Sequence, residues 1–433
     1  MTAAISASCQ QEPVQVSLGY SSPLGINSTD KELTESLRDS SGQFQKALVL
    51  HRVKEPYTLV TNHPIPLLLG EDEVLIKVAA IGLNPVDWKS PAFNFGIPSL
   101  PWVLGRDLAG VVVQTSPSQN FTVRIKTGDL VLVPSTDYRD IRKAAFQEYA
   151  VAAHYNAARI PRTISMYQGA SLGVAFVAAT LALGVCFGLD FSTLHAAPGP
   201  NLLHILHEMN QKDIPEDIIA ECFSVADKAQ RVQPEDWIAI WGASTTTGYM
   251  MLQIAKQCGL KVVCVADIAR HGQQLLEAGA HLLVDRYDTV RAIKVIQGVT
   301  GGRLRYALDM VGCETATILQ DALNTSPERP QAHLLGLTGL PKSKHLRVCY
   351  HTVPIKLFHS CPIIGDSIMR WLECLLQAKV LQPPGLIVQE KGGLVVINDA
   401  LNMLRDGTVS GKRVVIDLDD SIVKNSGMDI AVN

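Results

Sequence analysis

The stretch from Asp236 to Asp267 constrains the fold of this chain more than any other. A short apolar run, Trp237–Trp241, is followed by a turn of small residues at 242–248. A helical pattern then covers 249–258, and the apolar run at 261–265 is typical of a second buried strand. Strand, tight turn, helix and strand make one βαβ unit, which predicts an α/β fold with a parallel sheet.

The turn in this unit matches a dinucleotide-binding fingerprint only in part. Placed on the pattern GxGxxG, it reads Ala243-x-Thr245-x-x-Gly248, so only the last glycine is present. A βαβ crossover in another α/β fold is therefore the alternative. Small residues would let a phosphate approach the helix N-terminus, and four hydroxyls could donate to its oxygens. These hydroxyls belong to Ser244, Thr245, Thr246 and Thr247.

Composition excludes several classes of protein. With 433 residues, the chain is long enough for two or three domains. Its net charge of -3 gives no sign of nucleic-acid binding. None of the nine cysteines has CxxC spacing, the histidines are dispersed without a metal-ligand spacing, and no signal peptide is evident. We therefore expect reduced thiols and a cytoplasmic location.

An uncharged apolar segment at 171–189 is long enough to suggest a membrane span. It is rich in Gly and Ala, and no cluster of Lys or Arg flanks it. We expect a buried helix there, and no association with a membrane.

The chain before and after this segment divides into recognisable parts. Residues 1–43 have the composition of a disordered tail. Short strands with turn residues between them predict a mostly β domain over 44–178. These strands are expected at 45–51, 73–80, 105–113, 128–133 and 146–152.

The βαβ unit begins only after an insertion at 190–235, which we predict to be helical at 201–209 and 216–229. The last part of the chain, 392–418, has the pattern of a helix, a turn and a strand, and we expect it to return to the first domain. Residues 421–433 form a second tail. Further elements are expected as strands at 282–285, 306–310 and 333–337 and as a helix at 366–378.

Several motifs in this order resemble those of the medium-chain dehydrogenase/reductases, over about residues 45–418. The motifs are Asn84-Pro85-Val86-Asp87-Trp88-Lys89, Gly105-Arg106-Asp107-x-x-Gly110, Gly128-Asp129, Phe146-x-Glu148-Tyr149 and Asp406-Gly407-x-Val409-Ser410-Gly411-Lys412. The resemblance implies a GroES-like, mostly β catalytic domain at 44–178, completed by 359–420. It also implies a Rossmann domain with a doubly wound parallel sheet at 179–358, and hydride transfer between the two.

The positions of the family's catalytic zinc ligands carry unsuitable side chains. Alcohol dehydrogenases of this family need a Cys after the second strand and a His-Glu pair in a Gly-His-Glu turn. Here those positions hold Asn84 and Arg106-Asp107, and residues 90–180 contain no cysteine for the structural zinc lobe. Because Arg cannot ligate Zn²⁺ and Asn is a poor ligand, we expect no metal and no alcohol oxidation.

Zinc-free members of the family usually reduce an activated double bond. The motif at 84–89 and the terminal motif at 409–412 most resemble fungal trans-acting enoyl reductases, which serve partner polyketide synthases. The resemblance implies a small-molecule or carrier-bound enoyl substrate, a possible partner synthase, and a monomer or homodimer. The alternatives are a quinone or alkenone oxidoreductase and a non-catalytic binding protein on the same fold.

Candidate site residues follow from these motifs. Lys89 could donate to a cofactor phosphate or a substrate carbonyl, or be a plain surface lysine. Tyr138 and Tyr149 are candidate proton donors, and a bound water would also serve. Asp87 has a second interpretation, in which it only caps the turn after Pro85. The remaining cofactor contacts predicted from the resemblance are Val86, Asp87, Trp88, Tyr287, Val409 and Ser410.

The choice of nicotinamide cofactor has two opposing indications. The trans-acting reductases use NADPH, which favours NADPH here. Asp267 follows the second strand of the βαβ unit, where an acid bonds a ribose 2′-hydroxyl and repels a 2′-phosphate. Arg270 could offset that charge. We expect NADPH, with NAD left possible because of Asp267.

Overall fold

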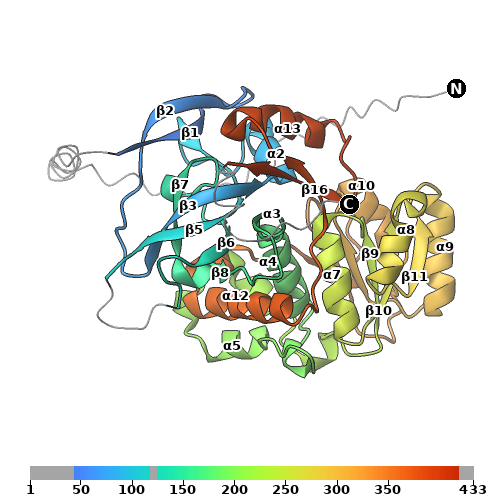
Figure 1. Ribbon diagram of the computed structural model, residues 1–433. Helices are drawn as coiled ribbons and strands as arrows, with labels where there is room; N and C mark the ends of the chain where they lie inside the picture. The colour runs from blue at the N-terminus through green and yellow to red at the C-terminus, as the bar shows by residue number, and fades with distance from the viewer. Residues whose placement is uncertain (1–42, 118–123, 419–433) are drawn as a thin grey trace, which may run out of the picture. The chain divides into compact units, whose positions relative to one another are not determined.

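The computed structural model describes residues 43–117 and 124–418 (Figure 1). The tails expected at 1–43 and 421–433 lie outside the described residues, apart from Gln43. Both sheets of the expected α/β fold are present, one mostly antiparallel and one parallel.

The mostly antiparallel sheet has seven strands in the order β15-β16-β3-β5-β6-β8, with β7 paired to β3. A smaller sheet, β2-β1-β4, lies on the same part of the chain. The strands are β1 Phe44–Leu50, β2 Thr58–Pro64, β3 Glu73–Gly82, β4 Trp102–Val103, β5 Asp107–Thr115, β6 Leu130–Pro134, β7 Tyr149–Ala153, β8 Ala158–Arg159, β15 Gly385–Gln389 and β16 Lys412–Asp417.

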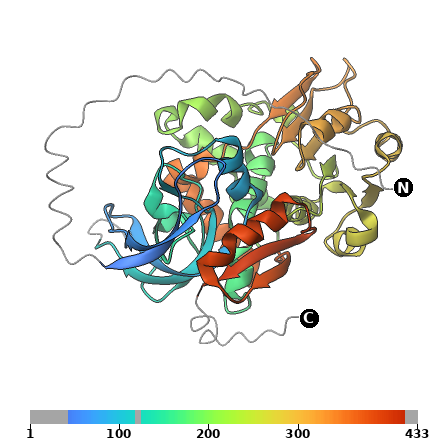
Figure 2. The ribbon, with the colours of Figure 1, turned by 90° about the horizontal axis from the view of Figure 1, so that it is seen from above.

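The C-terminal segment returns to this sheet, as the sequence predicted. Strand β16 pairs antiparallel with β3, with Val415 opposite Gly82. Helix α13, Ile397–Arg405, packs against helix α2, Pro85–Phe93. Figure 2 shows the red C-terminal helix and strand lying against the blue and cyan elements from the start of the fold.

The parallel sheet has six strands in the order β11-β10-β9-β12-β13-β14. Numbered along the chain, this is the 3-2-1-4-5-6 order of a Rossmann fold, with the crossover between β9 and β12. Its strands are β9 Trp237–Trp241, β10 Lys261–Ala266, β11 Leu282–Asp285, β12 Tyr306–Asp309, β13 Ala332–Gly336 and β14 Val348–His351. The βαβ unit is therefore confirmed, with α7, Thr246–Gln257, as its helix.

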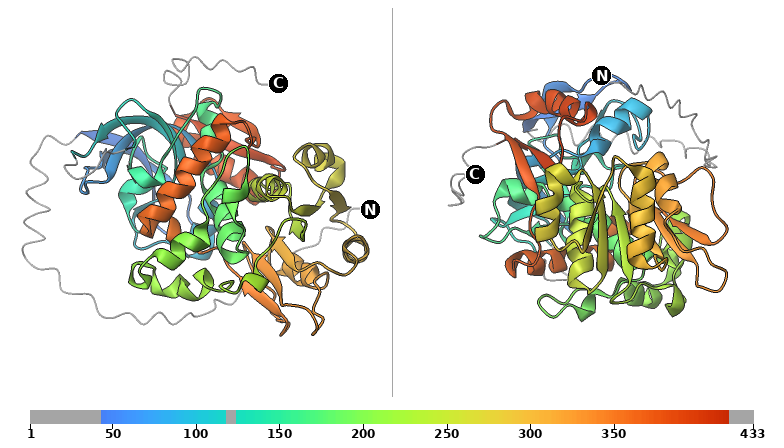
Figure 3. Two further views of the ribbon diagram at one scale, coloured as in Figure 1. Left: turned by 90° about the horizontal axis from the view of Figure 1, so that it is seen from below. Right: turned by 90° about the vertical axis from the view of Figure 1, so that its right-hand side faces the viewer.

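Helices flank the parallel sheet, as the right-hand view of Figure 3 shows. They include α8 Ile268–Glu277, α9 Thr289–Thr300 and α10 Cys313–Gln320. Helices α11 Lys356–Ser360 and α12 Pro362–Gln377 follow β14, and α12 contacts β8 of the other sheet. The apolar segment forms α4, Gly173–Leu181, and a π-helical turn at Ala182–Cys186, after the short α3, Met166–Ala170. Helix α4 packs against α7, and its residues are almost all buried. Among the described residues, no helix has the length and apolarity needed to cross a membrane.

The insertion is less helical than the sequence predicted. Helix α5, Leu202–Glu208, agrees with the first prediction. The second, at 216–229, is confirmed only as far as residue 222: a 3₁₀ turn leads into α6, Ile219–Cys222, and the chain then leaves helical geometry. Ser224 Oγ donates to the Glu221 carbonyl at 2.8 Å, and Asp227 caps a new turn. Such side chains compete with the backbone ladder and end a helix.

Candidate functional site

The motif at 84–89 forms the first turns of helix α2. Asn84 is the N-cap, Pro85 takes the first helical position, and the Asp87 carboxylate accepts a hydrogen bond from Asn84 N at 2.7 Å. The Asp87 side chain is buried, and this burial raises its pKa to about 7. Tyr57 donates its hydroxyl to the Asp87 carbonyl at 2.7 Å. This geometry supports the capping interpretation of Asp87 over a contact with a cofactor.

Lys89 and Trp88 carry unsatisfied polar groups on the same helix. Lys89 Nζ lies 5.8 Å from the centre of the Trp88 ring, and partial burial lowers the pKa of Lys89. Lys89 makes no ion pair within 43–117 and 124–418. Trp88 Nε1 is buried and has no hydrogen-bond partner among the described residues, and Val86 is partly exposed. A cation without an acid beside an unused donor is suited to an anionic or carbonyl ligand.

The positions of the missing zinc ligands are filled by a buried polar network. Asn84 Nδ2 donates to Asp107 Oδ2 at 3.0 Å, and Val174 N donates to Asp107 Oδ1 at 2.7 Å. The Arg413 guanidinium forms a buried ion pair with the same carboxylate. Because both oxygens of the Asp107 carboxylate already accept hydrogen bonds, and one member of the set is a cation, the residues do not fit a catalytic zinc ion.

Among the described residues, Arg106 makes no ion pair with its chain neighbour Asp107. Strand β16 runs beside β3 and brings Arg413 to the carboxylate instead. The Arg106 guanidinium lies 5.6 Å from the centre of the Tyr138 ring, and burial lowers its pKa. The Tyr138 carbonyl accepts from Trp102 Nε1 at 3.2 Å. Arg106 and Trp102 therefore both contact Tyr138. Arg106 is a site candidate that the sequence analysis missed.

The turn after β9 has the geometry of a phosphate-binding turn. Gly242 has φ +80°, and a Cβ on Gly248 would lie 2.6 Å from the Gly242 carbonyl oxygen, so both positions require glycine. Thr245 is the N-cap of α7: its Oγ1 accepts from Gly248 N at 3.1 Å and donates to Gly242 O at 2.8 Å. The Thr245 hydroxyl is therefore used inside the turn, which corrects its expected role as a phosphate donor.

The other hydroxyls of this turn remain available. Ser244, Thr246 and Thr247 are partly exposed. The first amides of a helix have no partner within it, so those of Thr246 and Thr247 could bind an anion. Lys89 and Tyr138 make no hydrogen bond with this turn in the part of the chain that the structure describes.

Replacing Ser244 and Thr247 together by alanine is expected to weaken binding of a dinucleotide by about 1–3 kcal/mol, because two donors to phosphate are lost. Titration with NADPH, followed by cofactor fluorescence, measures the change. Thr245→Ala is the matched control, which should lower thermal stability through loss of the cap, by about 1 kcal/mol. Unchanged affinity in the double variant would contradict this placement of the phosphates.

The acid after β10 lies in a cluster of positive charge. Asp267 caps α8, accepting from Arg270 N at 3.3 Å, and Arg270 Nε lies 3.5 Å from its Oδ2. Tyr287 donates its hydroxyl to Asp267 Oδ2 at 3.0 Å, and Arg286 donates to Tyr287 Oη at 2.9 Å. The structure thus brings together three residues predicted from the sequence. Arg286 was missed, although a basic residue directly after the strand at 282–285 was a signal for it.

The C-terminal motif reaches the same region. Ser410 Oγ lies 2.7 Å from His271 Nε2, and His271 stands one helical turn after Asp267. Gly411 has φ +65°, and a Cβ there would lie 2.4 Å from the His271 ring. Val409 packs instead on the core of the mostly antiparallel sheet. Of the two predicted contacts, Ser410 is therefore the one beside the Asp267 cluster.

The two sheets and these positions indicate an oxidoreductase, and comparison with known proteins agrees. The family model for the alcohol dehydrogenase GroES-like domain matches residues 70–162, and the model for zinc-binding dehydrogenases matches residues 246–359. The chain is therefore similar to the medium-chain dehydrogenase/reductases in both of these parts.

Among characterised proteins, the chain is similar to trans-enoyl reductases. The trans-enoyl reductase buaC of Petromyces alliaceus is 25% identical over 376 residues, which cover 82% of this chain and 92% of the relative. Two solved structures share the fold. A quinone oxidoreductase of Pseudomonas syringae pv. Tomato matches 86% of this chain and 99% of its own, with TM-score 0.63 and 19% identity. A mycobacterial protein complexed with NADPH matches the same shares, with TM-score 0.63 and 17% identity.

Proposed function

We propose that this protein is an NADPH-dependent enoyl reductase, which reduces a C=C bond conjugated to a thioester carbonyl. The observation that carries the proposal is the network of Asn84, Asp107 and Arg413 at the positions of the zinc ligands. Because these side chains are already paired with one another, they would not hold the metal ion that acts as Lewis acid in alcohol oxidation. Addition of hydride to an alkene that its own carbonyl already polarises needs no metal at that position.

The residues around α2 would supply the remaining chemistry. Bound NADPH supplies hydride to the β-carbon. Lys89 would donate to the carbonyl oxygen and stabilise the enolate-like charge, or hold a cofactor phosphate. Tyr138 would give a proton to the α-carbon, which completes the reduction of the double bond. The Arg106 guanidinium lies 5.6 Å from the centre of the Tyr138 ring, and the proton that Tyr138 gives up would be replaced from solvent.

NADPH is the preferred cofactor because the charge of Asp267 is offset. Tyr287 and Arg270 bond its carboxylate, and Arg286 adds a second guanidinium through Tyr287. A 2′-phosphate bound here would lie near the guanidinium groups of Arg270 and Arg286. The Asp267 carboxylate beside it already accepts hydrogen bonds. The mycobacterial relative in fold was solved with NADPH, which supports the same choice.

Quinone reduction is the second candidate, favoured by the quinone oxidoreductase that shares the fold. The likeness to trans-enoyl reductases covers 82% of the chain at 25–28% identity. It supports an enoyl substrate carried by a partner synthase. A carrier domain would then present the acyl chain to this protein.

The assay is oxidation of NADPH in the presence of an enoyl thioester or a quinone. We expect turnover of the thioester, slower reaction with NADH, and a saturated thioester as product. The matched control is the Ser244→Ala/Thr247→Ala variant, which should need more NADPH for the same rate. Rapid turnover of the quinone without turnover of any enoyl thioester would replace the first proposal by the second.

A further inference from the structure

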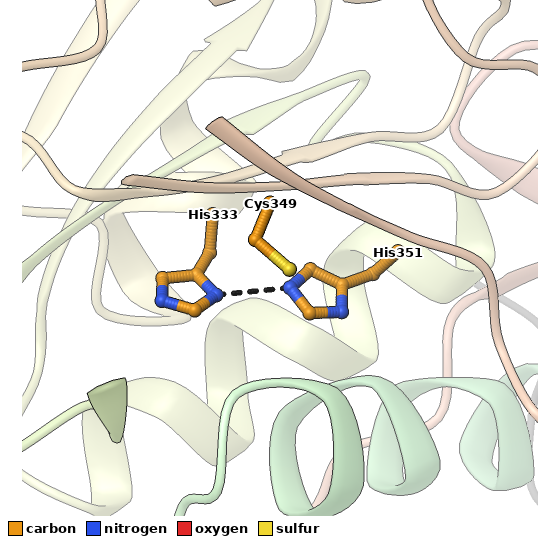
Figure 4. A group of neighbouring side chains, drawn as sticks. All are labelled: His333, Cys349 and His351. Carbon is orange, nitrogen blue, oxygen red and sulfur yellow. Dashed lines mark hydrogen bonds between the residues drawn. The ribbon is translucent and has the colours of Figure 1, made fainter. Parts of the chain in front are cut away.

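Three side chains with metal-binding atoms meet on the last two strands of the parallel sheet. His333 lies on β13, and Cys349 and His351 lie on β14 (Figure 4). His333 is paired in register with Cys349, and residues two apart on a strand face the same side. His333 Nδ1 lies 2.9 Å from His351 Nε2, and the ligand atoms of all three lie within 4.8 Å of one another.

The insertion at 190–235 supplies acceptors to the outer side of each imidazole. Glu221 Oε1 lies 2.6 Å from His351 Nδ1, and Gln230 Oε1 lies 3.1 Å from His333 Nε2. Metal-bound histidines almost always donate their other ring N–H to such a carboxylate or carbonyl oxygen. The insertion therefore provides for both rings what the outer shell of a metal site provides.

Counting protons shows why this arrangement calls for a cation. A neutral imidazole has one N–H. If His351 donates to Glu221 and His333 donates to Gln230, the two inner nitrogens face each other with lone pairs at 2.9 Å. A metal ion on the Cys349 side would accept both lone pairs. A proton shared between the rings, or a Gln230 amide turned to donate, is the alternative.

The two histidines of this cluster are buried, whereas Cys349 is partly exposed. His333 is 1% exposed and His351 is 0% exposed. The Tyr306 ring stacks on His333 with centres 5.3 Å apart, and the Phe187 ring meets His351 edge-on at 5.8 Å. Cys349 is partly exposed, so an ion could enter from its side.

We propose that His333 Nδ1, His351 Nε2 and the Cys349 thiolate bind a zinc ion, with water in the fourth position. Imidazole nitrogen and thiolate sulfur are the ligands that Zn²⁺ prefers. Cys186 and Glu221 form a second group with His351. Because Glu221 meets Nδ1 of that ring, the second group lies on the other side of it. The metal is assigned to the Nε2 side.

This site departs from the expectation of a metal-free chain. The expectation rested on the catalytic zinc position and on ligand spacing, and both arguments stand for the residues they concern. The three ligands here form no sequence motif, because His333 and Cys349 meet only through the pairing of β13 with β14. The ion would link β13 to β14, and the insertion would hold the two imidazoles in place through Glu221 and Gln230.

The test is the metal content of the full chain, purified without a histidine tag or a chelator. Elemental analysis should find about one zinc per chain. Cobalt loaded in its place should give a thiolate-to-cobalt charge-transfer absorption. Cys349→Ser should lose this absorption and most of the metal. Cys374→Ser, which changes an exposed cysteine on α12, is the matched control and should keep both.

Two outcomes would overturn the proposal. If the wild-type protein takes up neither Zn²⁺ nor Co²⁺ after dialysis, the two imidazoles share a proton instead of binding a metal ion. Equal metal content in Cys349→Ser and Cys374→Ser would place the ion elsewhere. If a variant folds poorly, the cobalt spectrum of the wild-type chain still shows whether a thiolate binds the metal. Loss or confirmation of this metal site leaves the proposal of enoyl reduction unchanged.

Discussion

Replacing Asp107 by alanine is expected to lower the free energy of unfolding by about 3–5 kcal/mol. The side chains of Asp107 and Arg413 are 1% and 6% exposed, so the substitution leaves a buried guanidinium without its acid. It also removes the acceptor for Asn84 Nδ2 and Val174 N. Chemical denaturation followed by circular dichroism measures the change.

An exposed ion pair serves as the control for this prediction. The side chains of Arg405 and Asp406 are 55% and 59% exposed, and Arg405→Ala should change stability by less than about 1 kcal/mol. A loss below about 1 kcal/mol for Asp107→Ala would mean that water reaches Arg413. The network of Asn84, Asp107 and Arg413 would then no longer argue against a metal ion at the position of the catalytic zinc.

The same pair shows where prediction from sequence ended. The strands and helix at 237–266 follow from local periodicity, and the structure confirms them. Arg413 lies 306 positions after Asp107, and only the return of β16 to β3 brings them together. Arg106, the chain neighbour of Asp107, instead lies against Tyr138.

The turn at 242–248 and the cluster at Asp267 show a second limit. Small residues and hydroxyls predicted the kind of turn, but hydrogen-bond geometry decides which hydroxyls are free, and Thr245 is not. Asp267, Arg270 and Tyr287 were predicted, and they lie together. The histidines of β13 and β14 were dismissed because parallel pairing has no signature in ligand spacing.

Lys89→Ala is expected to lower kcat/KM for an enoyl thioester by about tenfold or more, or about 1.4 kcal/mol. The lysine has no acid partner among the described residues, and partial burial lowers its pKa, so its charge is available to a ligand. Steady-state kinetics with NADPH measure the loss. Lys126→Ala, at an exposed position, is the control and should leave kcat/KM unchanged.

The pH profile separates a role in charge stabilisation from a role in packing. Lys89 acts as a cation, so the rate should fall as pH rises through its lowered pKa, and this limb should be absent in Lys89→Ala. Lys89→Arg keeps the charge and should keep part of the activity. A higher KM for NADPH with kcat unchanged would place Lys89 on a cofactor phosphate, whereas a lower kcat would place it on the carbonyl oxygen. If Lys89→Ala has wild-type kinetics and the same fall in rate at high pH, the lysine is a surface residue without a catalytic role. Arg106, which lies against Tyr138, then becomes the cation to test.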